Sequence, residues 1–325
     1  LVMQLGLLAS FSLISGVLDL PFAYYSQFRL EAKFGFNKMT PGLFWMDTVK
    51  STGIAAVIGM PLCAIVLWLM GQMGDLWWLY VWLVWTLFQL LIMMIYPNWI
   101  APLFNKFSPL EDQSLVQKIE GLMQRVGFAS KGLFVMDGSK RSAHGNAYFS
   151  GFGNNKRIVF FDTLIERLAP QEVEAVLAHE LGHFKLKHIV KRMVVMFAVS
   201  LGFLALLGFL KSQIWFYTGL GVDPVMFASS NSAMALILFM ITLPVFTFVL
   251  SPLTSISSRK HEFEADAFAV KHTNANDLVT ALVKLYEDNA STLTPDPVHS
   301  AFYDSHPPAS IRIAHLHQQG QAAAA

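Results

Sequence analysis

The sequence predicts an all-α membrane protein with several spans and one small α+β domain, and three observations support this fold class. Hydrophobic residues make up 54% of the 325 positions and charged residues only 14%, whereas soluble domains carry about 25% charged residues. Five apolar segments reach the roughly 20 residues that a helix needs to cross a bilayer. A long polar region separates the third segment from the fourth. The five expected spans are about 1–24, 51–73, 76–96, 190–210 and 232–256.

The segment 76–96, LWWLYVWLVWTLFQLLIMMIY, has no charged residue and is rich in Trp and Tyr, as spans anchored at a membrane interface are. Buried core helices of a soluble protein are the alternative, and five such runs in one chain disfavour it. The net charge is +1 and no long run of Lys and Arg occurs, so we expect no nucleic-acid partner. The single cysteine, Cys63, excludes an intrachain disulfide and a Cys-rich metal site. Any metal must therefore be held by His and carboxylate side chains.

Basic residues alternate from one side of the expected spans to the other, which predicts their orientation. The loop 25–50 and the polar region 97–189 are rich in Lys and Arg, and a basic pair at 259–260 follows the last span. The loop 211–231 has a single basic residue at its edge. Because Lys and Arg concentrate on the cytoplasmic side, we expect the polar region to face the cytoplasm, in a bacterial inner membrane or the endoplasmic reticulum.

Four parts are expected along the chain. The chain opens on Leu1 rather than Met, without the pattern of a signal peptide, so we expect its natural beginning to lie upstream. The four parts are residues 1–96 with spans one to three and the cytoplasmic loop 25–50, 97–189 as a cytoplasmic domain, 190–256 with spans four and five, and 257–325 as a second cytoplasmic segment.

The polar region reads as a small domain of helices and strands. The stretch 108–128 has apolar residues at helical spacing, which predicts an amphipathic helix. Two β-like runs at 132–137 and 156–162 flank the stretch NAYFSGFG at 146–153. Pro170 suits the first turn of a further helix. That helix contains the motif of greatest interest.

The stretch AVLAHELGHFKLKH contains His179 and His183, which lie four apart and therefore project from one face of a helix. Two imidazoles at this spacing can bind one ion, and Glu180 can reach a metal-bound water without being a ligand, as in HExxH metalloproteases. Zinc suits imidazole and carboxylate ligands and needs three of them in a catalytic site. The motif predicts a zinc-metallopeptidase domain with Glu180 as the general base and then the general acid.

The third ligand is expected after the last span. Glu262 and Asp266 lie four apart in SSRKHEFEADAFAV, so on a helix Glu262 can complete a His-His-Glu set while Asp266 orients a ligand imidazole. The alternative is a solvated, charged helix end. Both segments belong to the same predicted side of the membrane, which favours their meeting.

HELGH at 179–183, followed after a spanning interval by SRKHEFEADAFA, resembles the type I CAAX prenyl proteases, which are integral-membrane zinc metallopeptidases. The related HtpX-type membrane proteases share the zinc motifs, but the SHPP and HGNAYF blocks favour the prenyl proteases. Members of the family have seven spans, so the resemblance implies that two helices precede Leu1. The further similar blocks are LPFAYYSQFRLEAKFGFNK at 20–38, IAPLFNKFSPL at 100–110, HGNAYFSGFGNNKRIVFFDTL at 144–164 and SHPPASIRIAHL at 305–316.

The resemblance also implies roles for residues outside the zinc motifs. His306 in SHPP would donate a hydrogen bond to the oxyanion, with Arg312 beside it; without the resemblance His306 reads as a loop histidine. The stretch Asn146, Ala147, Tyr148 and Phe149 would be an exposed strand edge that pairs with an extended substrate, or else an ordinary hairpin strand. His144, His188 and His261 fit no ligand spacing and are expected to be surface groups or to lie behind the ligands.

The function that follows is a membrane-embedded zinc endopeptidase with one Zn²⁺ per chain. By resemblance its substrates are proteins or peptides with a prenylated C-terminal cysteine, from which it removes the last three residues, and membrane lipid is its second partner. One alternative is quality control of membrane proteins, as in the HtpX relatives. An alternative from another class is a non-enzymatic scaffold with a structural zinc. A transporter ranks last, because no charged residues line the spans in the pattern that a transport pathway needs.

Overall fold

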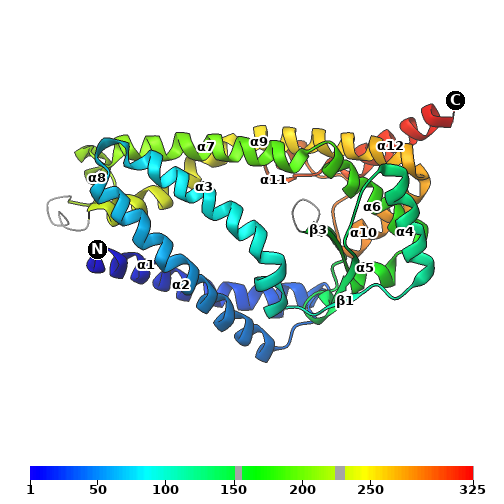
Figure 1. Ribbon diagram of the computed structural model, residues 1–325, viewed down its shortest axis with the longest axis horizontal. Coiled ribbons are helices and arrows are strands. Elements are labelled where there is room, and N and C mark those ends of the chain that lie inside the picture. The colour runs from blue at the N-terminus through cyan, green and yellow to red at the C-terminus, as the bar shows by residue number, and fades with distance from the viewer. Residues whose placement is uncertain (151–155, 224–230, 325) are drawn as a thin grey trace. The chain divides into compact units, whose positions relative to one another are not determined.

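The structure, a computed structural model of the chain, describes residues 1–150, 156–223 and 231–324 (Figure 1). The chain divides into two compact units, each with its own hydrophobic core. The first unit comprises Leu1–Leu30, Thr40–Ile92 and Arg192–Phe248, and the second comprises Glu31–Met39, Met93–Lys191 and Val249–Ala325. Both parts of the predicted metal site therefore belong to the second unit.

Five helices among the described residues are long and apolar enough to cross a membrane, as the sequence predicts. Large apolar side chains on them are exposed, for example Val57 at 75% and Phe246 at 72%, as expected where lipid tails take the place of water. The five helices are α1 (Val2–Tyr25), α2 (Pro41–Gln72), α3 (Trp77–Ile95), α7 (His188–Leu210) and α9 (Asn231–His272). Short helices accompany them: η1 (Ser26–Glu31), η2 (Gly74–Leu76) and α8 (Ile214–Thr218).

Two of the helices extend beyond the spans predicted for them. Helix α2 begins at Pro41 and not near 51, because Thr40 caps it by accepting a hydrogen bond from the amide of Leu43 at 3.2 Å. The predicted loop 25–50 is therefore helical over its last ten residues. Helix α9 does not end near 256 but continues to His272. Hydropathy marks the apolar part of a helix and says little about where a polar extension ends.

Apolar contacts and hydrogen bonds between helices hold the described part of the first unit together. The indole of Trp82 donates to the carbonyl of Phe197 at 2.9 Å, which joins α3 to α7. The ammonium of Lys211 donates to the carbonyl of Met70 at 2.8 Å, which satisfies the C-terminal end of α2. The core includes Leu67, Trp77, Val81, Leu207, Phe216, Tyr217, Ala233 and Ala235.

The second unit contains a sheet of four strands in the order β1-β2-β4-β3. β2 and β4 are parallel, and the outer strands β1 and β3 are antiparallel to their neighbours. β3 occupies one edge, in register with β4 so that Tyr148 lies opposite Val159. The strands are β1 (Phe107–Pro109), β2 (Leu133–Met136), β3 (Ala147–Ser150) and β4 (Arg157–Phe161), which confirms the two runs predicted from the sequence. Residues 151–155 of the predicted blocks lie outside the described residues.

The predicted amphipathic helix is α4 (Gln113–Val126). Asp112 caps it by accepting from the amides of Ser114 and Leu115, and Gly127 ends it with a left-handed φ of 64°. The remaining helices of the second unit are η3 (Tyr96–Ile100), η4 (Ala101–Leu103), η5 (Gly138–Lys140), α5 (Asp162–Arg167), α6 (Pro170–Lys185), α10 (Ala275–Asp288), α11 (Pro297–Tyr303) and α12 (Ala309–Ala324).

Helix α6 carries the HELGH motif through the core of the second unit. It begins at Pro170, as predicted, and the carboxylate of Glu172 accepts a hydrogen bond from the amide of Ala169 at 2.7 Å. α6 packs against α4, α10 and β3, which lie around it in Figure 1. Its apolar face meets the sheet and α10 in a core that includes Leu115, Ile119, Ile158, Phe160, Val173, Leu177, Leu181 and Leu278. The motif is therefore fixed on a buried, well-packed helix.

Candidate active site

The candidate site lies where α6 crosses the C-terminal part of α9. Gly182, inside the HELGH motif, permits this crossing: a Cβ at this position would lie 3.0 Å from the Cα of Ala265 and 3.1 Å from the Cβ of Phe268. Ala265 is itself fully buried. Small residues on both helices let the backbones approach closely, so side chains one turn away on each helix can share one ion.

His179 and His183 from α6 and Glu262 from α9 bring three ligand atoms together. The two Nε2 atoms lie 3.1 Å apart. The Glu262 carboxylate places Oε2 3.4 Å from Nε2 of His179 and Oε1 3.2 Å from Nε2 of His183. Ligands at about 2.05 Å from a tetrahedral zinc lie about 3.3 Å from one another. The spacing thus suits a metal ion of this size, and the predicted ligand set is brought together.

The burial of the cluster also fits a bound cation. His179 is 6% exposed and Glu262 is 5% exposed, and Oε2 of Glu262 is buried without a hydrogen bond. A buried carboxylate oxygen without a hydrogen bond costs free energy, which coordination to a cation would recover. These three residues can therefore hold a metal ion, with further coordination positions open for water and substrate.

Asp266 and Arg312 lie directly behind His179. Oδ1 of Asp266 is 2.8 Å from Nδ1 of His179, and the guanidinium of Arg312 donates two hydrogen bonds of 2.7 Å to the same carboxylate. Asp266 is fully buried and Arg312 is 5% exposed. Asp266 therefore sits where it was expected, and Arg312 forms a bidentate pair with it while its Nη1 lies 3.5 Å from Glu262.

Glu180 follows the first histidine ligand and lies at the edge of the cluster. Its side chain is half-buried. Burial raises the pKa of its carboxyl above the usual value of 4.5, and the nearby His179 and His183 oppose that rise. A carboxyl with a raised pKa beside a metal site is suited to accept and return a proton.

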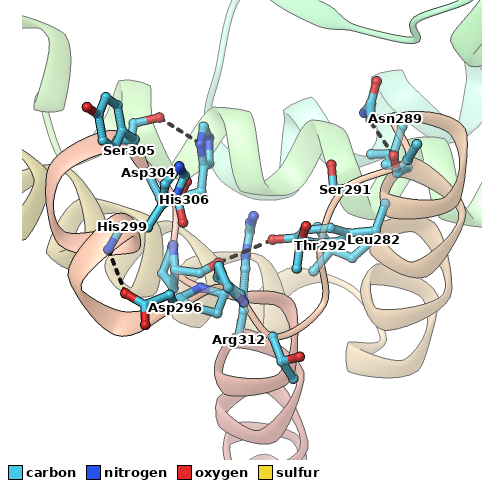
Figure 2. Close-up of a pocket in the computed structure, with 18 residues that line it drawn as sticks. Leu282, Asn289, Ser291, Thr292, Asp296, His299, Asp304, Ser305, His306 and Arg312 are labelled. Atoms are coloured by element: carbon cyan, nitrogen blue, oxygen red, sulfur yellow. Dashed lines mark hydrogen bonds between the residues drawn. The ribbon is translucent and has the colours of Figure 1, made fainter. Parts of the chain in front are cut away.

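His306 lies on the open side of the cluster, in the turn before α12. Its Nε2 is 3.6 Å from Oε1 of Glu262, its side chain is 60% exposed, and Oγ of Ser305 lies 2.9 Å from its Nδ1 (Figure 2). His306 and Arg312 line a cavity of about 800 Å³ together with residues of α10, α11 and the loop between them. His306 and Arg312 thus lie between this cavity and the Glu262 carboxylate.

The predicted substrate strand is the edge strand β3, which packs against α6. Ala147 is buried, and Tyr148 and Phe149 are half-buried. Asn146 precedes the strand; its side chain accepts from the amide of Ala147 at 2.8 Å and its carbonyl accepts from Phe161 at 2.9 Å. The structure thus places an edge strand beside the helix that bears the ligands.

One contact behind the ligands was not foreseen. Nδ1 of His188 lies 3.0 Å from Nδ1 of His183, and its Nε2 lies 2.9 Å from Glu264. His188 is only 3% exposed, so of the two places expected for it, at the surface or behind the ligands, it occupies the second. Lys187, with a φ of 57°, turns the chain between α6 and α7. That turn removes the helical spacing on which a prediction for His188 would depend.

His188, His261 and Glu264 form a second group of possible metal ligands. The rings of His188 and His261 stack with centroids 4.1 Å apart. If Nδ1 of His183 donates to His188, the proton of His188 is on Nε2, and it is donated to Glu264. A second ion would need the lone pair of that same nitrogen. The hydrogen-bonded chain from His183 to Glu264 therefore excludes an ion on His188 while both bonds persist.

An HExxH helix, a carboxylate ligand from a following helix and five apolar helices together define a membrane metallopeptidase. The family described as "CAAX prenyl protease N-terminal, five membrane helices" matches residues 1–106, and peptidase family M48 matches residues 109–319. The chain belongs to the CAAX prenyl protease 1 family within the M48 peptidases. It is an integral multi-pass membrane metalloprotease, as the resemblance predicts.

Individual relatives are similar to this chain over most of their own length. The chain is 41% identical over 314 residues to the CAAX prenyl protease 1 homolog of Arabidopsis thaliana, covering 95% of this chain and 72% of that protein. It is 40% identical over 325 residues to CAAX prenyl protease 1 of Saccharomyces cerevisiae, covering 96% and 71%. The crystal structure of S. mikatae Ste24p matches with a TM-score of 0.88 at 36% identity, covering 95% of this chain and 74% of that one. The predicted fold class is thereby confirmed.

Proposed function

We propose that the chain holds one Zn²⁺ between His179, His183 and Glu262 and cleaves prenylated proteins on the N-terminal side of their last three residues. The observation that carries this proposal is the cluster of two imidazole Nε2 atoms 3.1 Å apart, each within 3.4 Å of one oxygen of the Glu262 carboxylate, whose Oε2 lacks a hydrogen bond. The relatives' name, CAAX prenyl protease 1, supports the substrate class.

Zinc bound there would polarise the scissile carbonyl and lower the pKa of its water to about 7. Glu180 takes the proton of the attacking water and returns it to the leaving amine. Asp266 accepts the Nδ1 proton of His179, so that Nε2 points its lone pair at the metal position. Arg312 neutralises the buried Asp266 carboxylate.

His306 stabilises the oxyanion of the tetrahedral intermediate in this proposal. If the hydroxyl of Ser305 donates to Nδ1 of His306, the ring carries its proton on Nε2, which faces the ligands. A neutral imidazole in that tautomer is a hydrogen-bond donor at the right place. The 60% exposure of His306 leaves room for a substrate carbonyl beside it.

The substrate lies along β3 as an added strand. Its backbone pairs with the free edge formed by Asn146, Ala147, Tyr148 and Phe149, and the packing of β3 on α6 supports this placement. An extended peptide held at this edge passes the metal ligands. The C-terminal residues would enter the cavity lined by His306 and Arg312.

The site opens toward the cytoplasm in this proposal. The four-part division, with spans in 1–96 and 190–256 and cytoplasmic parts in 97–189 and 257–325, places every strongly basic segment on that side. The membrane is the bacterial inner membrane or the endoplasmic reticulum. Lipid surrounds the spans and delivers the prenyl group of the substrate laterally.

A cleavage assay tests the substrate class. The detergent-solubilised chain is incubated, with and without zinc, with a farnesylated CAAX peptide and with its unprenylated counterpart. Zinc-dependent cleavage of the farnesylated peptide with a clear preference over its unprenylated twin is expected. Glu180→Gln should bind zinc equally and lose at least 100-fold in kcat, in line with removal of a general base. Equal cleavage of both peptides would favour a quality-control protease, and bound zinc without any turnover would favour a scaffold.

A further inference from the structure

A second cavity lies on the sheet of the second unit, away from the metal ligands. It has a volume of about 560 Å³, within the range of small-molecule sites. We call it the basic pocket; its lining residues used below are Pro97, Asn98, Asn105, Lys106, Tyr148 and Arg157. Among the described residues that line it there is no Asp or Glu.

The basic pocket and the metal site lie on opposite faces of the sheet. Side chains alternate along a strand, and Ala147 and Phe149 of β3 face the core that contains α6. Tyr148 and Ser150 therefore face the other way, into the basic pocket. On β4, Ile158 belongs to the core and Arg157 lines the pocket. The pocket is thus not an extension of the metal site.

The chemistry of the lining is that of an anion site. Lys106 and Arg157 contribute two positive charges, and no carboxylate among the described residues lies within ion-pair distance of either. The guanidinium of Arg157 is half-buried and held over the ring of Phe134 at 5.3 Å. A guanidinium fixed in this way loses little entropy when it binds a phosphate.

Asn105 adds a fixed donor. Arg141, which can only donate, lies 2.6 Å from Oδ1 of Asn105 and 2.7 Å from the carbonyl of Phe104. The oxygen of the Asn105 amide is therefore occupied, and its NH₂ group remains to donate to a ligand in the pocket. Asn105, Lys106 and Arg157 can thus all donate to a ligand in the pocket, and no carboxylate among the lining residues competes for them.

The basic pocket begins where the apolar part of the third long helix ends. The 19 residues of α3 are about 28 Å long at 1.5 Å per residue, close to the roughly 30 Å of bilayer hydrocarbon. The helical run continues as η3 and η4 to Leu103, and η3 carries Tyr96, which is 49% exposed, and Trp99, which is 76% exposed, as aromatic residues at an interface are. Pro97 and Asn98, between them, form part of the pocket wall.

We propose that the basic pocket binds the phosphate headgroup of an anionic phospholipid. Lys106, Arg157 and the Asn105 amide hold the phosphate, and the acyl chains extend into the bilayer beside the end of α3. Basic pockets at the cytoplasmic ends of membrane helices bind such headgroups by the same means. Each cation near an anionic lipid contributes about 1 kcal/mol, which is a factor of about five in affinity.

The test is a titration of the detergent-solubilised full chain with short-chain phosphatidylglycerol, with phosphatidylcholine and inorganic phosphate as the other two probes. Phosphatidylglycerol is expected to bind more tightly than either. Lys106→Gln and Arg157→Gln should each weaken phosphatidylglycerol binding about fivefold, and about 30-fold together. The control Lys131→Gln removes an exposed cation of the same unit outside the pocket and should leave binding unchanged.

Three results would overturn the proposal. Equal affinity for phosphatidylcholine would show that the pocket does not distinguish an anionic headgroup from a zwitterionic one. If inorganic phosphate binds as tightly as the lipid, the site belongs to a soluble phosphate compound. If Lys106→Gln and Arg157→Gln leave lipid binding unchanged but raise the KM for a neutral peptide substrate, the pocket binds substrate and not lipid. Should Arg157→Gln fail to fold, the exposed Lys106→Gln alone decides the outcome.

Discussion

At the residue scale, each histidine ligand has its outer nitrogen occupied by a partner. Nδ1 of His179 lies 2.8 Å from Asp266, and Nδ1 of His183 lies 3.0 Å from His188, which in turn contacts Glu264. Both contacts favour the Nδ1–H tautomer and leave Nε2 for the metal. Metal affinity should therefore depend on residues that never touch the ion.

His188→Ala is expected to lower zinc affinity about 10- to 100-fold, because His183 then lacks the acceptor that orients its ring. Competition with a chelator measures the change. His261→Phe is the matched control, since it keeps an aromatic ring beside His188 and removes both ring nitrogens that could bind an ion. Loss of one of two bound ions in His261→Phe would show instead that His188, His261 and Glu264 hold a metal of their own.

If Glu180 is the general base, as proposed, its pKa sets the acid limb of the pH profile. Burial raises the pKa of its carboxyl, and a general base works only when it is deprotonated. Activity is therefore present above that raised pKa and is lost as the pH falls through it. As the pH is lowered, we expect kcat/KM to start to fall before the pH reaches 4.5, the usual pKa of Glu. A profile that stays flat down to pH 4.5 would contradict this.

The ligand set was predictable from the sequence because the spacing of four in HExxH and in ExxxD has a fixed meaning on a helix. The contact of His188 with His183 was not predictable from the sequence. Lys187 ends the helix between them, so a spacing of five residues does not place the two side chains relative to one another. The bidentate pairing of Arg312 with Asp266 likewise joins residues far apart in the chain and needed the structure.

At the element scale, the site depends on how closely α6 approaches α9. Gly182 faces Ala265 at the crossing, and a methyl group there would meet backbone atoms at 3.0 and 3.1 Å. Backbone atoms cannot move aside as a flexible side chain can. The glycine of HELGH is thus part of the metal site through packing alone.

Gly182→Ala should push the two helices apart, at a cost of about 1–3 kcal/mol in stability, and weaken zinc binding because Glu262 moves with α9. Thermal unfolding and chelator competition measure the two effects. Gly121→Ala, on α4, is the control: its Cβ would meet only the end of the Arg125 side chain at 3.5 Å, so about 0.5–1 kcal/mol of added stability is expected. Wild-type zinc affinity in Gly182→Ala would refute the packing role.

The number and the order of the long helices followed from hydropathy, whereas their ends did not. α2 starts ten residues early because Thr40 and Pro41 form a capped helix start outside the apolar run. α9 continues past its apolar part because nothing between 256 and 272 breaks a helix, and this continuity carries Glu262 and Asp266 into the site.

At the scale of the whole molecule, basic residues are unevenly distributed among the segments between the spans. The polar region 97–189 carries 11 of the 23 Lys and Arg, whereas the loop 211–231 after α7 carries one. By the positive-inside rule, this pattern supports the proposed orientation, with the polar region in the cytoplasm.

Single cysteines in a Cys63→Ser background test this orientation. Lys140 and Ser212 are both exposed, and they lie in the basic polar region and in the loop after α7. In sealed vesicles of known sidedness, Lys140→Cys should react with an impermeant maleimide only from the cytoplasmic side and Ser212→Cys only from the other. Labelling of both from one side would reject the proposed topology.

The central claim is that one zinc ion is shared by two imidazoles of α6 and one carboxylate of α9. Zinc content of the purified full chain, read together with X-ray absorption at the zinc edge, tests it most directly. We predict one zinc per chain, with two imidazole nitrogens and carboxylate oxygen at about 2.0–2.2 Å, and less than a tenth of that zinc after dialysis of Glu262→Ala. One tightly bound zinc per chain in Glu262→Ala, with unchanged absorption, would contradict it.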